Sequence, residues 1–63
     1  MNRYEVKWET SIGMGATFYQ GKETLCADSD EAAEAIAQFN VWRRAFRDWP
    51  KSHVIVTSVK EVK

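Results

Sequence analysis

The sequence is short of the residues that disulfide frameworks and membrane spans need. Its 63 residues include a single cysteine, Cys26, so no intramolecular disulfide can form. Small secreted domains usually carry several disulfides, and a reducing cytoplasm is therefore the expected location. No apolar run is long enough to cross a bilayer, and the charged, alternating start of the chain is unlike a signal peptide. We therefore expect a cytoplasmic protein that does not associate with membranes.

Net charge is also lacking, because nine basic and nine acidic residues cancel. A protein that coats nucleic acid needs a broad excess of lysine and arginine, so the composition argues against that class. The charges are nevertheless unevenly placed. Residues 1–37 hold three basic and seven acidic groups, whereas residues 38–63 hold six and two. This asymmetry leaves room for a small basic or acidic binding site.

What the chain does contain is enough apolar material for one core. Hydrophobic residues make up 44% of the sequence and aromatic residues 13%, which is typical of a globular protein. A chain of this length lies near the lower limit for a stable single core, so nearly every large apolar side chain is needed inside. We expect one domain over residues 1–63, as a monomer or as a homodimer formed through strand edges.

The first half of the chain predicts two strands. In "RYEVKWET" the residues Tyr4, Val6 and Trp8 alternate with charged residues, which indicates a half-buried strand. The motif "GMG" at 13–15 is typical of a hairpin turn, because glycine adopts positive φ at no steric cost. Without a following helix, the same motif does not match a phosphate-binding loop.

The return strand is expected from Ala16 toward Ala27. Gly21 interrupts this run and marks either a bulge or a second tight turn that divides it into two short strands. We favour one bent strand. After Pro50, the β-branched run "HVIVTSVKEV" predicts a further strand.

The segment "DSDEAAEAIAQFNVWRRAF" predicts a helix. Asp28 is positioned to cap its first turn and Glu31 to complete a capping box, while Pro50 closes the element. At 100° per residue, one broad apolar stripe is expected to lie on the sheet. It comprises Ala32, Ala35, Ile36, Phe39, Trp42 and Phe46.

The order strand, strand, helix, strand predicts the α+β class. We expect a single two-layer domain with one helix packed on an antiparallel sheet of three strands, or of four if Gly21 marks a turn. A right-handed crossover would place the first strand in the middle.

A basic pole follows from the stretch "WRRAFRDWP" and the residue after it. Its members are Arg43, Arg44, Arg47, Trp49 and Lys51. Positive charge near a helix C-terminus is favourable in itself, which explains much of the cluster. Arg43 is directed between Ala32 and Ile36, where it can stack on a ring or contact a partner. Tryptophan and arginine are also frequent in interface hot spots, so this pole is the first candidate for partner binding.

An acidic pole at the start of the helix is the alternative site. It comprises Asp28, Asp30, Glu31 and Glu34. These residues suit a helix N-terminus, and their spacing does not match a calcium loop, so no metal is expected. In this alternative the pole mimics the charge of nucleic acid and binds a basic partner.

No catalytic signature is present, and we expect neither an enzyme nor a cofactor. His53 is the only histidine and Cys26 the only thiol, and they belong to separate predicted elements. A domain of this size also leaves little room for a ligand pocket. If Tyr19 joined the charged face of the first strand, the sheet would show an aromatic among charges, as in some RNA-binding sheets.

The expected function is therefore a non-catalytic protein–protein interaction module. In size and style only, the chain resembles the compact inhibitors by which phages and other mobile elements block host machinery, anti-CRISPR proteins among them. That resemblance implies docking on a host protein or protein complex and transfers no functional residue. The alternative is a small nucleic-acid-binding protein that places Arg43, Arg44, Arg47 and Lys51 on phosphates.

Overall fold

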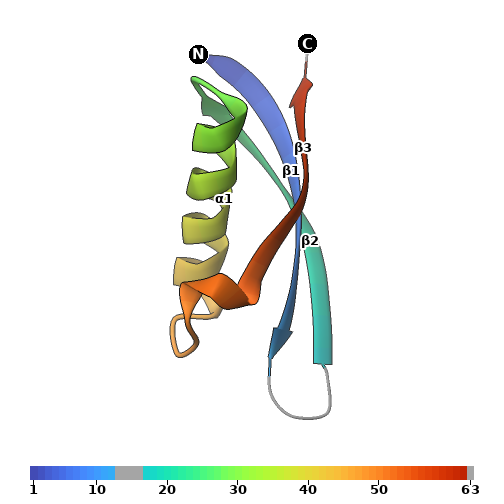
Figure 1. The fold of residues 1–63 in the computed structure, drawn as a ribbon, viewed down its shortest axis with the longest axis vertical. Helices are drawn as coiled ribbons and strands as arrows, with labels where there is room; N and C mark the ends of the chain where they lie inside the picture. The colour runs from blue at the N-terminus through green and yellow to red at the C-terminus, as the bar shows by residue number, and fades with distance from the viewer. Residues whose placement is uncertain (13–16, 63) are drawn as a thin grey trace.

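The architecture is a three-stranded sheet with one helix lying along one of its faces (Figure 1). The computed structural model describes residues 1–12 and 17–62. Its elements are β1 (Asn2–Ile12), β2 (Thr17–Ala27), α1 (Asp30–Ala45), a 3-10 turn η1 (Lys51–His53) and β3 (Val54–Val62). The predicted α+β class and element order are confirmed. The predicted turn at "GMG" lies outside the described residues.

The sheet has the order β2-β1-β3, and both pairs of strands are antiparallel. The first strand is therefore central, as predicted. β2 is continuous through Gly21, which pairs with Trp8 without any shift of register. A single strand is thus confirmed, and both the bulge and the second turn considered at Gly21 are wrong.

The register shift in the sheet lies between β1 and β3 instead. Lys7 pairs with Ser58 and Trp8 with Val56, so Thr57 is an extra residue on β3. The Thr57 hydroxyl donates to the carbonyl of Lys7 at 3.3 Å. A β-bulge of this kind bends its strand and increases the local twist.

The helix begins one residue later than the capping box predicts. Ser29 is the N-cap, with extended backbone, and its hydroxyl accepts the backbone N–H of Ala32 at 3.1 Å. Asp28 is therefore not the cap. Asp30 and Glu31 lie in the first turn, where negative charge interacts favourably with the helix dipole.

The buried face of α1 also differs from the predicted stripe. The helix buries Ala33, Ala37 and Val41, spaced four residues apart. Of the predicted stripe, Ala32, Trp42 and Phe46 do pack against the core, whereas Ala35, Ile36 and Phe39 are exposed. Small side chains allow the helix backbone to lie close to the sheet, and the strands supply most of the larger side chains of the core beneath it. The helix also ends at Ala45, well before Pro50, with the Phe46 N–H bonded to the Trp42 carbonyl.

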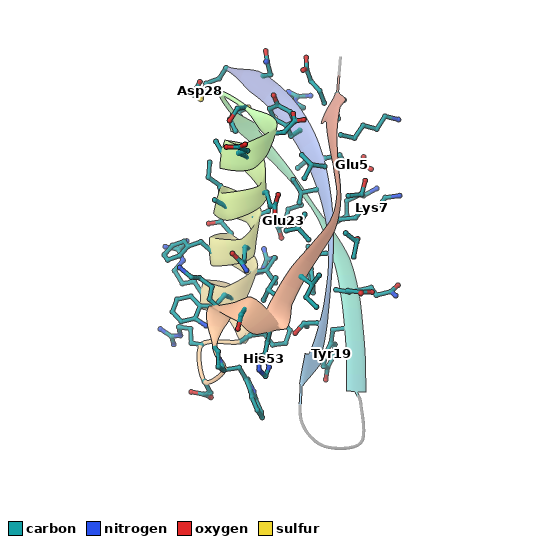
Figure 2. All side chains as sticks on the ribbon, in the orientation of Figure 1. Glu5, Lys7, Tyr19, Glu23, Asp28 and His53 are labelled. Carbon is teal, nitrogen blue, oxygen red and sulfur yellow. The ribbon has the colours of Figure 1, made fainter. Side chains whose placement is uncertain are left out.

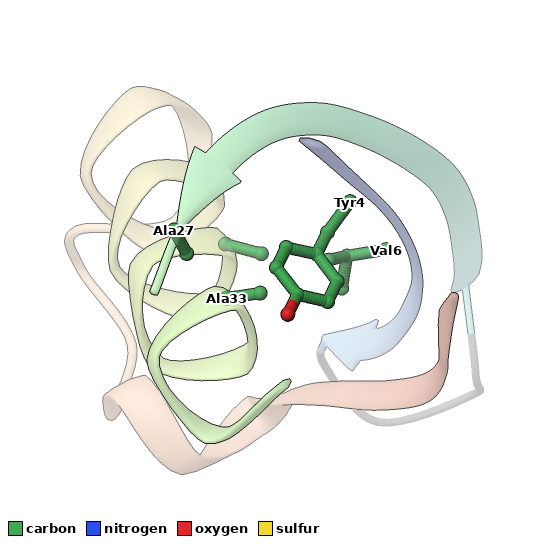
Figure 3. Close-up of a cluster of buried hydrophobic side chains, with 5 residues drawn as sticks. Tyr4, Val6, Ala27 and Ala33 are labelled. Atoms are coloured by element: carbon green, nitrogen blue, oxygen red, sulfur yellow. The ribbon is translucent and has the colours of Figure 1, made fainter. Parts of the chain in front are cut away.

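The core consists of two adjoining clusters. In the first, the ring of Tyr4 lies between β1 and α1 beside Val6, Ala27 and Ala33 (Figure 3). The second is formed by Val41, Phe46 and Val54, with Trp8 and Trp42 packed against it. Burial of these side chains holds the helix on the sheet, because each contributes on the order of 1–3 kcal/mol.

The molecule is elongated, with principal extents of 39 × 16 × 15 Å. β1 and β2 continue past the C-terminal end of α1 (Figure 1). In the part of the chain that the structure describes, no helix is long and apolar enough to span a membrane.

Candidate functional site

Hydrogen bonds fix the segment that follows α1 against the end of the helix. The indole N–H of Trp42 donates to the carbonyl of Trp49 at 2.6 Å. The side-chain amide of Gln38 donates to the carbonyls of Lys51 and Val54, at 3.2 and 3.0 Å. These bonds tie residues 49–54 to the helix, so the side chains of both are presented together as one surface.

Phe39 is the centre of that surface. Phe39 is 42% exposed. Aromatic rings project from the C-terminal half of α1 on the side away from the sheet (Figure 2). The Arg43 guanidinium lies 5.6 Å from the ring centroid, and the Lys51 ammonium lies 5.8 Å from it. The Trp42 ring is 5.9 Å away and tilted by 42°. A cation within about 6 Å of an aromatic ring is attracted to its face, so both cations have a preferred place beside Phe39.

Trp49 extends the surface along the segment after the helix. It is 39% exposed and stacks on His53, with ring centroids 5.6 Å apart and an interplanar angle of 26°. Its side chain is thus oriented by His53 while its carbonyl is held by Trp42. We call Phe39, Trp42, Arg43, Trp49 and Lys51 the aromatic–basic surface.

The structure does not bring all of the predicted basic pole together. Arg43, Trp49 and Lys51 belong to the aromatic–basic surface, and Arg47 is exposed in the segment just after the helix. Arg44 instead forms a charge-assisted hydrogen bond with Glu23 of β2. Glu23 lies between the helix and the sheet (Figure 2), with its side chain 16% exposed. Arg44 therefore joins α1 to β2 and has its charge compensated within the molecule.

The acidic pole lies at the other end of the helix. Asp28 is near the N-terminal end of α1 (Figure 2), and Asp30, Glu31 and Glu34 are exposed in the first turns. A helix of 16 residues is about 24 Å long, which separates the two poles. Over residues 1–12 and 17–62, the structure contains no cluster of three metal-ligating side chains.

Tyr19 does not lie on the charged outer face of the sheet. It pairs with Thr10, which is buried on the helix side of β1, so cross-strand neighbours place Tyr19 on that side as well. Its ring contacts Phe46, at 5.8 Å between centroids. The condition for an aromatic among the outer-face charges is therefore not met by Tyr19.

Two open hollows lie on the described surface. One, of about 420 Å³, lies between the end of α1 and β2, and Trp8, Tyr19 and Phe46 line it together with Arg44. The other, of about 430 Å³, lies on the outer face of the sheet. Both are open to solvent and do not enclose a ligand-sized cavity.

Sequence reasoning missed Phe39 and Ile36 as surface residues because it assigned them to the core stripe. A signal was present in the four-residue spacing of Phe39 and Arg43, which places a ring and a cation side by side on a helix. No corresponding sequence signal identifies Lys51, because its position depends on the fold of residues 46–53.

Comparison with known proteins found no matching family model, no curated protein and no solved structure with significant similarity to the chain.

Proposed function

We propose that the protein is a non-catalytic protein-binding module and that it contacts its partner through the aromatic–basic surface. The observation that carries this proposal is the environment of Phe39. Phe39 is 42% exposed, and the cationic groups of Arg43 and Lys51 lie 5.6 and 5.8 Å from its ring centroid. A chain this short needs most of its aromatic residues in the core, so an aromatic ring displayed beside two cations is the first candidate for a partner contact.

The composition and rigidity of the surface support this function. Tryptophan and arginine dominate the hot spots of protein interfaces, and both occur here beside an exposed phenylalanine. The hydrogen bonds from Trp42 and Gln38 already hold residues 49–54 in place. A preorganised surface loses little conformational entropy on binding, so more of the contact energy is retained as affinity.

The charges define the chemistry of the partner. Among the residues that the structure describes, no carboxylate lies within salt-bridge distance of Arg43 or Lys51. A partner that places an apolar group on Phe39 and carboxylates beside the two cations complements this surface. Opposite charges also speed encounter and reject partners of the same sign.

Binding of single-stranded nucleic acid is the second candidate, since such proteins combine aromatic rings that stack bases with cations that contact phosphates. The neutral net charge and the pairing of Arg44 with Glu23 favour a protein partner instead. The two candidates differ in their dependence on salt. Phosphate contacts release counterions and weaken steeply as salt rises, whereas an apolar anchor does not.

The experiment is an affinity capture from lysate of the natural host, divided into nuclease-treated and untreated halves. The tagged wild type is compared with a Phe39→Ala, Arg43→Glu double variant. The matched control is Ile55→Ala, Lys60→Glu, which makes the same change of charge and also truncates an exposed apolar side chain, on the outer face of β3. Circular dichroism is used to check that all three proteins are folded.

The proposal predicts one protein that survives nuclease, is retained by the control and is lost with the double variant. Equal capture by the two variants would contradict it, and recovery that depends on nucleic acid would establish the second candidate. An inhibitor of the anti-CRISPR kind would in addition block the activity of the captured partner, which can then be assayed directly.

A further inference from the structure

Two lysines lie directly opposite each other on the outer face of the sheet. Lys7 of β1 pairs with Lys22 of β2 in the antiparallel register. Like charges in directly opposed positions destabilise a sheet, because their side chains are held within a few ångströms of each other. Lys22 forms one long ion pair, of 3.9 Å with Glu5, which offsets the repulsion only in part.

The lysine pair borders the hollow of about 430 Å³ on this face. Gly21 also lines the hollow, although a side chain at this position would lie on the helix side of the sheet, against Trp8. The bulge on β3 adds Thr57 to the wall, and the Thr57 hydroxyl is already bonded to the Lys7 carbonyl. Gln20 brings an amide, which is a neutral hydrogen-bond donor. Two lysines and one amide residue therefore line an open hollow.

We infer that this hollow is an anion site for a phosphate group, held by Lys7 and Lys22 with Gln20 as a neutral donor. A phosphate near neutral pH carries between one and two negative charges, which matches the two ammonium groups, and lysine is a common phosphate ligand. A bound phosphate would remove the repulsion between the lysines. Glu9 also lines the hollow, and its carboxylate opposes the anion and limits affinity.

The site is independent of the proposed protein-binding function. Lys7 projects from the sheet away from α1 (Figure 2), whereas the aromatic–basic surface lies on the helix. Loss of one is therefore not expected to affect the other.

The test is a titration of the isotope-labelled protein with inorganic phosphate, against sodium chloride at matched ionic strength, followed by backbone amide NMR shifts. We expect saturable shifts at Lys7, Gly21, Lys22 and Thr57. Lys22→Gln should weaken binding about tenfold, because it removes a charged hydrogen bond. Lys60→Gln is the matched control, since Lys60 lies on the same face opposite Glu5 and outside the hollow. It should change the affinity by less than about twofold.

A variant that is expected to bind phosphate more tightly provides a further test. Glu9→Gln removes the opposing carboxylate and should tighten phosphate binding by about twofold to fivefold. Shifts no larger than those with chloride, or equal losses in Lys22→Gln and Lys60→Gln, would overturn the inference. A parallel titration with a thymidine oligonucleotide distinguishes the source of the phosphate. Tighter binding of the oligonucleotide through the same lysines identifies a nucleic-acid backbone, and binding of inorganic phosphate alone identifies a free phosphate compound.

Discussion

Trp8 and Gly21 face each other across β1 and β2, and the indole ring occupies the space that a side chain at position 21 would fill. A Cβ built on Gly21 would lie 2.6 Å from Cε2 of Trp8 and 3.0 Å from its Nε1. The ring in turn meets Phe46 edge-on, with centroids 6.2 Å apart. Gly21 thus allows Trp8 to lie flat across β2 and to pack against the end of the helix.

Gly21→Ala should therefore destabilise the protein, although alanine normally suits a strand better than glycine. Forcing a methyl group into a filled space costs about 1–3 kcal/mol. The loss should appear as a lower urea midpoint. In a Trp8→Leu background the same substitution should cost much less, because the ring is gone; an equal cost in both backgrounds would show that Trp8 is not the cause.

The Arg44–Glu23 pair should stabilise the attachment of α1 to β2. Arg44→Met leaves the largely buried carboxylate of Glu23 without its partner and should lower the free energy of unfolding by about 1–3 kcal/mol. Arg43→Met removes an exposed cation and should change it by less than about 0.5 kcal/mol. Denaturant unfolding measures both values, and similar effects would contradict the different roles given to the two arginines.

The start of the helix gives a third prediction. Ser29→Ala removes the hydroxyl that accepts the Ala32 N–H and should cost about 1 kcal/mol. Asp28→Ala leaves this hydrogen bond intact and should cost less. Thermal unfolding of the two variants compares them directly, and a larger loss for Asp28→Ala would restore the capping box that the sequence favoured.

The orientation of the helix gives a fourth prediction. Val41 is 1% exposed, and Val41→Ala should cost about 2 kcal/mol through lost burial and the cavity that remains. Ile36→Ala removes a larger side chain from an exposed position and should change stability by less than about 0.5 kcal/mol. A greater loss for Ile36→Ala would mean that the helix packs by the face that includes Ile36.

The strands and their order could be predicted because their signals are local. Alternation in β1 identifies the side that carries Tyr4 and Val6, and the single helix leaves few ways to arrange three strands. The register shift at Thr57 could not be predicted, because the β-branched residues of β3 suit either alignment of this strand with β1.

The helix face was predicted wrongly for a physical reason that bears on function. Periodicity assigns large apolar residues such as Phe39 to the core, whereas this helix packs through Ala33 and Ala37. Phe39 is therefore both a residue whose burial was predicted wrongly and a member of the candidate surface. Local rules often fail at functional sites, which is one reason to test this surface first.

The most direct test of partner binding through the aromatic–basic surface is photo-crosslinking from the position of Phe39. A p-benzoyl-phenylalanine residue replaces Phe39 in one protein and the exposed Ile55 in another, and both are irradiated in nuclease-treated host lysate. We expect one protein adduct from position 39 and none from position 55. Excess wild type should suppress this adduct, and excess Arg43→Glu, Lys51→Glu should not. An adduct from position 55 alone, or equal competition by the variant, would contradict the assignment of the aromatic–basic surface to partner binding.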